Sequence, residues 1–253
     1  PSTRTRVSFE TGIVQLGGHT VNLSLDQMQH SRGESVGDTA KTLSQYVDVI
    51  VARVYEHSFI EDLAKHATIP VINGLSNSYH PCQTLADMMT IKEQFGVFKD
   101  LKIAWVGDGN NVATSWLHAS TKLGFEFRIA TPPGLRLNQE MISWAKEQGG
   151  QAIEFTDPKD AVEGADCVIT DTWVSMGHNV ELTERRKILK PYQVNTSLMA
   201  GAKNNALFMH CLPAHRGEEV TGEVIDGPRS VVWDEAENRL HIQKSILAWC
   251  LHF

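Results

Sequence analysis

Short apolar runs rich in β-branched residues alternate along the chain with longer stretches whose apolar residues recur at helical spacing. This alternation is typical of βα units around a parallel sheet. Nine runs have the composition of strands, and nine strands indicate two sheets. We therefore expect an α/β fold of two doubly wound domains, each with a central, mainly parallel sheet. The predicted strands are residues 19–23, 47–55, 69–75, 101–107, 126–131, 151–155, 166–171, 206–212 and 230–236.

The pattern also predicts where the chain crosses between domains. A helix is expected from about Gln83 to Phe95, ending at Gly96, and a new strand follows it. We place an N-terminally incomplete first domain at residues 1–96 and a second domain at residues 97–236.

The last stretch, residues 237–253, is expected to form one amphipathic helix that packs back on the first domain. Its apolar side is predicted to carry Ile242, Ile246, Leu247 and Trp249.

Composition argues against several classes of protein. With 253 residues and 42% hydrophobic residues, the chain can bury a sizeable core, which makes disorder a poor description. No apolar run approaches the roughly 18 residues that suggest a membrane span, and no secretory-type segment opens the sequence. The net charge of −7 argues against a general nucleic-acid surface. We expect a cytoplasmic protein that binds neither nucleic acid nor membrane, or a mitochondrial matrix protein whose targeting segment has been removed.

The four cysteines, Cys82, Cys167, Cys211 and Cys250, lie far apart and form no CxxC pair. This spacing indicates neither a disulfide framework nor a thiolate metal site, so free thiols are expected.

The first residues, Ser2-Thr3-Arg4-Thr5-Arg6, gather hydroxyl and guanidinium groups at the start of a predicted helix. Unpaired backbone N–H groups, the helix dipole and bidentate arginine contacts all favour a phosphate there. The alternative is an ordinary capping serine on an exposed helix.

Four further polar residues stand at element ends. Arg53 lies near the end of a strongly apolar strand, where ligands bind in α/β proteins. His80 and Gln83 open the crossing helix and could polarise a carbonyl or hold an oxyanion, although a helix that simply begins at a proline has the same pattern. Arg239 lies near the expected start of the last helix, where it is either a surface residue or a ligand.

Residues 107–109 form a glycine turn between a strand and a helix, which invites comparison with a dinucleotide fingerprint. The third glycine is replaced by Val112, and the next strand is not followed by an acid that could hold a ribose. We interpret the turn as a small-ligand loop that offers Asn110 and Asn111.

Two more strand ends carry polar groups. Asp171 and Ser175 follow one predicted strand, and an amino group would suit the acid. His210 and Cys211 end another. With His215 as a third ligand they could suggest a metal site, or thiol catalysis, but the spacing does not match common zinc sites and buried cysteines are more often small apolar residues.

Taken together, STRTR at residues 2–6, HPCQ at 80–83, DTWVSMG at 171–177 and HCLP at 210–213 resemble the aspartate/ornithine carbamoyltransferase family. The similarity extends over nearly the whole chain. The first two motifs are shared with the aspartate branch, whereas SMG and HCLP are the pattern of the ornithine branch.

The resemblance implies transfer of a carbamoyl group from carbamoyl phosphate to the side-chain amine of L-ornithine, without cofactor or metal. It assigns catalytic roles to Arg53, His80, Asp171 and Cys211, with no covalent nucleophile. Implied contacts to carbamoyl phosphate come from Ser2, Thr3, Arg4, Thr5, Gln29, Arg53, His80, Gln83, Cys211, Leu212 and Arg239. Implied contacts to ornithine come from Asn111, Asp171, Ser175 and Met176, with Cys211 near its amino groups.

The resemblance also implies a homotrimer in which Gln29 reaches the site of a neighbouring subunit, and domains that close around substrate. Relatives have a helix and a strand before the phosphate loop. Their absence here leads us to expect either a fragment or a rebuilt first domain. Three alternatives stay open: a carbamoyltransferase for another amine such as putrescine or an acylated ornithine, a dinucleotide-dependent oxidoreductase, and a truncated non-catalytic homologue.

Overall fold

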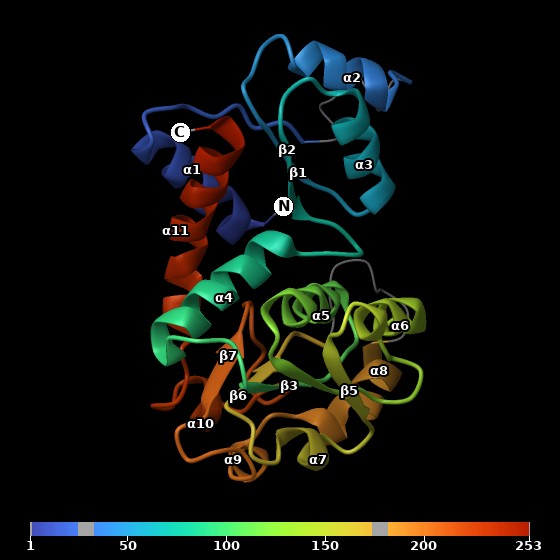
Figure 1. Ribbon diagram of the computed structural model, residues 1–253, viewed down its shortest axis with the longest axis vertical. Coiled ribbons are helices and arrows are strands. Elements are labelled where there is room, and N and C mark those ends of the chain that lie inside the picture. The colour runs from blue at the N-terminus through green and yellow to red at the C-terminus, as the bar shows by residue number, and fades with distance from the viewer. Residues whose placement is uncertain (1, 25–32, 174–181, 253) are drawn as a thin grey trace. The chain divides into compact units, whose positions relative to one another are not determined.

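The computed structural model describes residues 2–24, 33–173 and 182–252 (Figure 1). The predicted site residues Gln29, Ser175 and Met176 lie outside these ranges.

By their internal contacts the residues fall into two compact units, which we describe separately. Unit 1 comprises Pro1–Leu85 and Arg239–Phe253, and unit 2 comprises Ala86–Asn238. Both divisions fall inside a helix, the first inside α4 (Pro81–Phe95) and the second inside α11 (Val232–Leu251).

Unit 1 contains a parallel pair of strands with helices around it. Strand β1 pairs with β2, with Ile50 opposite Val71. A cluster of Phe9, Ile72, Cys82 and Leu247 joins residues of α1, β2, α4 and α11 into one small core. The elements of this unit, besides parts of α4 and α11, are α1 (Thr3–Gln15), α2 (Val36–Leu43), β1 (Ile50–Arg53), α3 (His57–His66) and β2 (Val71–Leu75).

Unit 2 is built on a five-stranded parallel sheet in the order β5-β4-β3-β6-β7. The chain moves outward from β3 to β5 and then returns to place β6 beside β3. The carboxyl ends of β3 and β6 therefore meet at the switch point, where ligands bind in open α/β sheets. The strands are β3 (Lys102–Val106), β4 (Glu126–Ala130), β5 (Gln151–Phe155), β6 (Cys167–Thr170) and β7 (Leu207–His210).

Helices cover both faces of this sheet (Figure 1). Alternate residues of β3 point to opposite faces. Ile103 and Trp105 pack with α5 and α6, and Ala104 and Val106 pack in the cluster that holds α7, α9 and α10. The helices are α5 (Asn111–Leu123), α6 (Gln139–Glu147), α7 (Pro158–Val162), α8 (Leu182–Leu189), the 3-10 helix η3 (Lys190–Tyr192), α9 (Thr196–Met199) and α10 (Gly222–Ile225).

The predicted α/β class with parallel sheets is confirmed, and seven of the nine predicted strands are present. Residues 19–23 are not a strand, and Val21 and Leu23 are exposed there. The strand predicted at residues 230–236 is also wrong. Of these residues only Ser230 forms a bridge, to Phe208, and helix α11 begins at Val232. A short apolar run fits a buried helix as well as a strand, and the acids at its end mark a first helical turn.

The last helix is confirmed but begins earlier than expected, and one of its apolar residues faces elsewhere. Leu247 is buried, whereas Trp249 is 79% exposed. Residues two apart on a helix point in nearly opposite directions, so the two cannot share one packed face. Among the described residues, no helix has the length and apolar character needed to cross a membrane.

Candidate functional site

In unit 1, the predicted anion-binding segment forms the first turn of α1. The Ser2 side chain caps this helix by accepting a hydrogen bond from the Thr5 amide at 3.4 Å. Thr3 and Arg4 are exposed on the same turn, while Thr5 is buried. Ser2 is therefore a helix cap, and the same turn presents the exposed polar groups of the predicted anion site.

Two arginines from distant parts of the sequence converge on Thr5. The Arg53 guanidinium, at the end of β1, donates to Thr5 Oγ1 at 2.9 Å, and Arg239 Nη2 donates to the same oxygen at 3.4 Å. Arg239 Nη1 also donates to Gln83 Oε1 at 2.6 Å. From the sequence alone, Arg239 could be either a surface residue or a ligand. It is in fact buried at 4% exposure.

His80 completes this group of unit 1 residues and is 5% exposed. Burial is the main reason why the pKa of His80 lies well below its usual value of 6.5, and three guanidinium groups lower it further. They belong to Arg239, Arg53 and Arg4. At neutral pH the imidazole is therefore uncharged and can donate a hydrogen bond from its one N–H group.

In unit 2, Asp171 follows β6 at the switch point and is held by three donors. Its Oδ1 accepts hydrogen bonds from the Thr172 amide at 2.7 Å and from the Cys211 thiol at 3.2 Å. Its Oδ2 accepts from the Asn110 side chain at 2.6 Å. Since β6 and β7 are neighbours, the predicted residues Asp171 and Cys211 come together as parallel strand ends should.

The residue of the glycine turn that contacts Asp171 is Asn110. Asn110 Oδ1 caps α5 by accepting from the Val112 and Ala113 amides, which aims its Nδ2 at Asp171. Asn111 is the first residue of that helix. The small-ligand loop predicted from the sequence offered both asparagines, whereas the ornithine contacts implied by the family resemblance included only Asn111 of the two.

The Cys211 thiol is protonated at neutral pH. Burial raises its pKa well above the usual value, and the carboxylate of Asp171 raises it further. A thiol in this state is a weak nucleophile and a hydrogen-bond donor.

Sequence reasoning missed the groups that support the end of β7. The His210 amide donates to the buried Glu235 Oε2 at 3.0 Å, and His210 Nε2 lies 3.3 Å from Oε1 of buried Glu219. His210 Nδ1 accepts from the Leu212 amide at 2.9 Å. Both ring nitrogens are thus engaged in hydrogen bonds. The three residues considered as metal ligands from the sequence do not form one group among the described residues, because His210 lies with Asp171 and Cys211, whereas His215 lies with Glu218 and Glu219.

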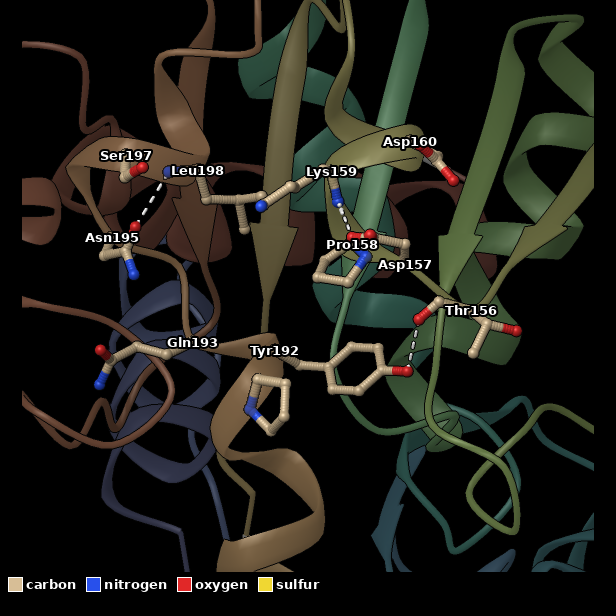
Figure 2. A pocket seen from close by; sticks show the side chains of 11 residues that line it. Thr156, Asp157, Pro158, Lys159, Asp160, Tyr192, Gln193, Asn195, Ser197 and Leu198 are labelled. Carbon is tan, nitrogen blue, oxygen red and sulfur yellow. Dashed lines mark hydrogen bonds between the residues drawn. The ribbon is translucent and has the colours of Figure 1, made fainter.

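Unit 2 also has a surface pocket of about 710 Å³ that contains none of the predicted site residues (Figure 2). Its polar groups serve local structure: Asp157 and Asn195 cap α7 and α9, and the Tyr192 hydroxyl donates to the Thr156 carbonyl at 2.6 Å. We therefore place the candidate site at the strand ends and not in this pocket.

Two family models match consecutive parts of the chain. The carbamoyl-P binding domain of aspartate/ornithine carbamoyltransferase matches residues 1–93, and the Asp/Orn binding domain matches residues 99–250. The ornithine carbamoyltransferase of Rhodopseudomonas palustris (strain BisA53) is 58% identical over 250 residues, covering 99% of this chain and 80% of the relative. The anabolic ornithine carbamoyltransferase of Pyrococcus furiosus is 57% identical over 252 residues, with coverage of 98% and 80%.

Solved structures agree with the sequence relatives. The ornithine carbamoyltransferase structure from Pyrococcus furiosus has a TM-score of 0.94 at 57% identity, covering 98% of this chain and 80% of that one. The structure from Thermus thermophilus has a TM-score of 0.91 at 43% identity, covering 99% and 83%. The resemblance carried by the four sequence motifs is confirmed: the chain belongs to the aspartate/ornithine carbamoyltransferase family.

Proposed function

We propose that this chain transfers the carbamoyl group of carbamoyl phosphate to the side-chain amine of L-ornithine, giving L-citrulline and phosphate. One observation carries the proposal. The motif residues form a cationic group in the part matched by the carbamoyl-P model and an acid–thiol group in the part matched by the Asp/Orn model. Curated relatives at 56–58% identity are named ornithine carbamoyltransferase.

In this proposal, unit 1 binds carbamoyl phosphate. The first turn of α1 takes the phosphate, with Ser2, Thr3, Arg4 and Thr5 as its contacts. Arg53, His80, Gln83 and Arg239 surround the carbamoyl carbonyl and the bridging oxygen. Donors that already point at the oxygen on which charge develops stabilise the tetrahedral intermediate more than the ground state. The low pKa of His80 supports a role as a neutral N–H donor.

Unit 2 binds ornithine in this proposal. Asp171 pairs with an ammonium group of ornithine, Cys211 forms a hydrogen bond with its neighbouring amino group, and Asn111 contributes a further contact. Leu212 meets the carbamoyl side through its backbone. Ser175 and Met176 are assigned to ornithine from the family pattern alone.

The transfer needs no dedicated base. The amine is an ammonium ion at neutral pH and must lose a first proton to solvent before it attacks, since its unperturbed pKa lies about three units above neutrality by analogy with lysine. The nitrogen–carbon bond forms, the bond from carbon to the phosphate oxygen breaks, and the departing phosphate accepts the proton that the amine releases. Nearby guanidinium groups favour the neutral amine because they disfavour a second cation.

We further propose a cytoplasmic homotrimer in which Gln29 of each subunit reaches the carbamoyl phosphate of its neighbour. The proposed domain limits are 1–96, 97–236 and 237–253. The relative from Pyrococcus furiosus is named anabolic. For this reason we propose that the chain acts in the biosynthetic direction, toward citrulline.

Citrulline formation by the purified protein tests the function. The assay supplies carbamoyl phosphate with ornithine, with putrescine or with an N-acylated ornithine. Arg53→Gln is expected to lower kcat by about 10²–10³-fold, the range for removing one oxyanion donor. Arg216→Gln, which removes an exposed ion pair with Asp226, is the matched control and should keep full activity. Failure to form citrulline, or a clear preference for another amine, would overturn the proposal.

A further inference from the structure

The turn that follows the HCLP motif in unit 2 brings three metal-ligating side chains close together. His215, Glu218 and Glu219 each offer one ligand atom, and these atoms lie within 4.8 Å of one another. Backbone hydrogen bonds close the turn, from the Glu218 amide to the His215 carbonyl at 2.9 Å and from the Gly217 amide to the Val220 carbonyl at 2.8 Å. The backbone therefore holds the imidazole near the two carboxylates.

One of the carboxylate oxygens is buried and has no hydrogen-bond partner among the described residues. The Glu219 side chain is fully buried. Its Oε1 accepts from the His215 amide and lies 3.3 Å from His210 Nε2, whereas its Oε2 has no such partner.

The Glu219 side chain is nevertheless ionised at neutral pH. Burial by itself would raise the pKa of Glu219, but hydrogen bonds from His210 and from the His215 backbone outweigh it, and the pKa lies below its usual value of 4.5. A buried carboxylate is costly unless an opposite charge compensates it. Oε2 is thus a place where a cation would be favoured.

The distance between Glu219 and His215 suits two ligands of one ion better than it suits a hydrogen bond. His215 Nδ1 lies 3.7 Å from Glu219 Oε2, which is too far for a hydrogen bond. Zinc binds nitrogen and carboxylate oxygen at about 2.0–2.2 Å in tetrahedral sites, so two of its ligands lie roughly 3.4 Å apart. Nδ1 also lies 3.1 Å from the Thr172 hydroxyl, a contact that coordination through this nitrogen replaces.

The third carboxylate is held by an arginine that an ion can displace. Glu218 Oε2 accepts from Arg186 Nε at 3.0 Å, and the two side chains are 31% and 47% exposed. Ion pairs as exposed as this one contribute little to stability. A divalent cation beside Glu219 would therefore compete with Arg186 for the Glu218 carboxylate.

We propose that His215, Glu218 and Glu219 form a binding site for a divalent transition-metal cation such as Zn²⁺, with water as the fourth ligand. One imidazole with two carboxylates suits such a cation better than Mg²⁺ or Ca²⁺, which prefer oxygen ligands alone. The site goes beyond the proposed carbamoyl transfer, which does not use it. The ion neutralises buried Glu219 and holds the turn that follows the HCLP motif.

Calorimetric titration of the metal-free full chain with ZnCl₂ measures the affinity. His215→Asn and Glu218→Gln are each expected to weaken Zn²⁺ binding at least about tenfold, because losing a ligand costs no less than losing a group that orients one. Arg186→Gln should tighten binding, since it removes the cation that competes for Glu218. His19→Asn and Glu223→Gln change exposed residues and are the matched controls, with unchanged affinity.

Cobalt separates this site from a second group of potential ligands in the described part of unit 2, Asp171, His210 and Cys211. Co²⁺ held by a thiolate absorbs strongly in the near ultraviolet, whereas Co²⁺ held by nitrogen and oxygen shows only weak bands in the visible. We expect the weak visible bands alone, and we expect His215→Asn to abolish them.

Zn²⁺ should also raise the melting temperature of the unaltered protein, because an ion that binds only the folded state stabilises it. The same concentration should raise the melting temperature of His215→Asn much less. The proposal is overturned if Zn²⁺ at millimolar concentration does not bind, if His215→Asn and Glu218→Gln bind it as tightly as the unaltered protein, or if cobalt shows only the thiolate absorption. Because these measurements need neither substrate, they stand whether or not the chain forms citrulline.

Discussion

Asp171→Asn should destabilise unit 2 because the structure leaves no orientation in which the new amide satisfies its neighbours. If the amide NH₂ replaces Oδ2, it faces the NH₂ of Asn110. If it replaces Oδ1, it faces the backbone N–H of Thr172, which cannot turn away. Asn110 cannot rotate freely to accept, since its oxygen caps α5. Every arrangement therefore contains one donor that faces another donor.

The magnitude follows from what is lost. A buried donor without an acceptor costs about 1–3 kcal/mol, and escaping the conflict by turning Asn110 costs the helix cap, which is typically worth about 1 kcal/mol. We expect a loss of about 1–3 kcal/mol. For a domain of this size each kcal/mol corresponds to roughly 2–4 °C in Tm.

A compensating substitution separates this polarity argument from a general loss of packing. Asn110→Asp alone places two carboxylate oxygens where 2.6 Å now separates donor and acceptor, and it should destabilise as well. When it is combined with Asp171→Asn, however, the new carboxylate at position 110 caps α5 with one oxygen and accepts from the new amide at position 171 with the other. The double variant should therefore be more stable than either single variant.

Urea unfolding followed by tryptophan fluorescence measures the cycle, because Trp105, Trp116 and Trp173 are buried in unit 2. Citrulline formation should stay lost in the double variant, since the negative charge then points at position 171 and not at the substrate. A double variant no more stable than Asp171→Asn would refute the reasoning. Recovered activity would refute the assignment of Asp171 to ornithine.

Three further outcomes are expected. A Cβ on Gly109 would lie 2.6 Å from backbone atoms of Arg136 and Leu137, so Gly109→Ala should cost about 1–3 kcal/mol, and an unchanged urea midpoint would contradict this. Burial lowers the pKa of His80 in the folded protein. At mildly acidic pH the unfolded chain therefore binds a proton at His80 that the folded chain does not bind. Stability should fall as pH drops below about 6.5, by up to about 1.4 kcal/mol per unit; His80→Asn should flatten this slope, and an unaltered slope would argue against it. The raised pKa of Cys211 should slow its alkylation by iodoacetamide at pH 8 at least about tenfold relative to the unfolded chain, and equal rates would show that the pKa of this thiol is not raised.

The parts of the site that follow from strand order could be predicted from the sequence. Arg53, Asp171 and Cys211 each lie at or just beyond the end of an apolar run, and parallel strands bring such ends to one edge of a sheet. The contact between Asp171 and Cys211 depends only on β6 and β7 being neighbours. The cap of α5 also has a local signal, because two asparagines, Asn110 and Asn111, precede the first apolar residue of the helix pattern and asparagine is a preferred cap, whereas the family resemblance pointed to Asn111.

Other parts depend on tertiary packing that leaves no local pattern. Arg239 bonds to Gln83, 156 residues earlier in the chain, and nothing near Arg239 distinguishes it from a surface arginine. Glu219 lies in the polar run HRGEEV, which has the composition of an exposed turn. Glu219 is buried because the next residue, Val220, forms a β-bridge with Val194. The neighbouring Glu218 is partly exposed and pairs with Arg186.

The chemistry around Asp171 explains why a thiol stands at position 211 in the proposed reaction. The three described donors to this carboxylate, Asn110, Thr172 and Cys211, are all uncharged, since the raised pKa keeps the thiol protonated. A lysine or arginine in the place of Cys211 would neutralise Asp171 and remove the attraction for an ammonium group. A serine would keep the hydrogen bond, so Cys211→Ser should bind ornithine with a modest change, while Cys211→Lys should lose that binding.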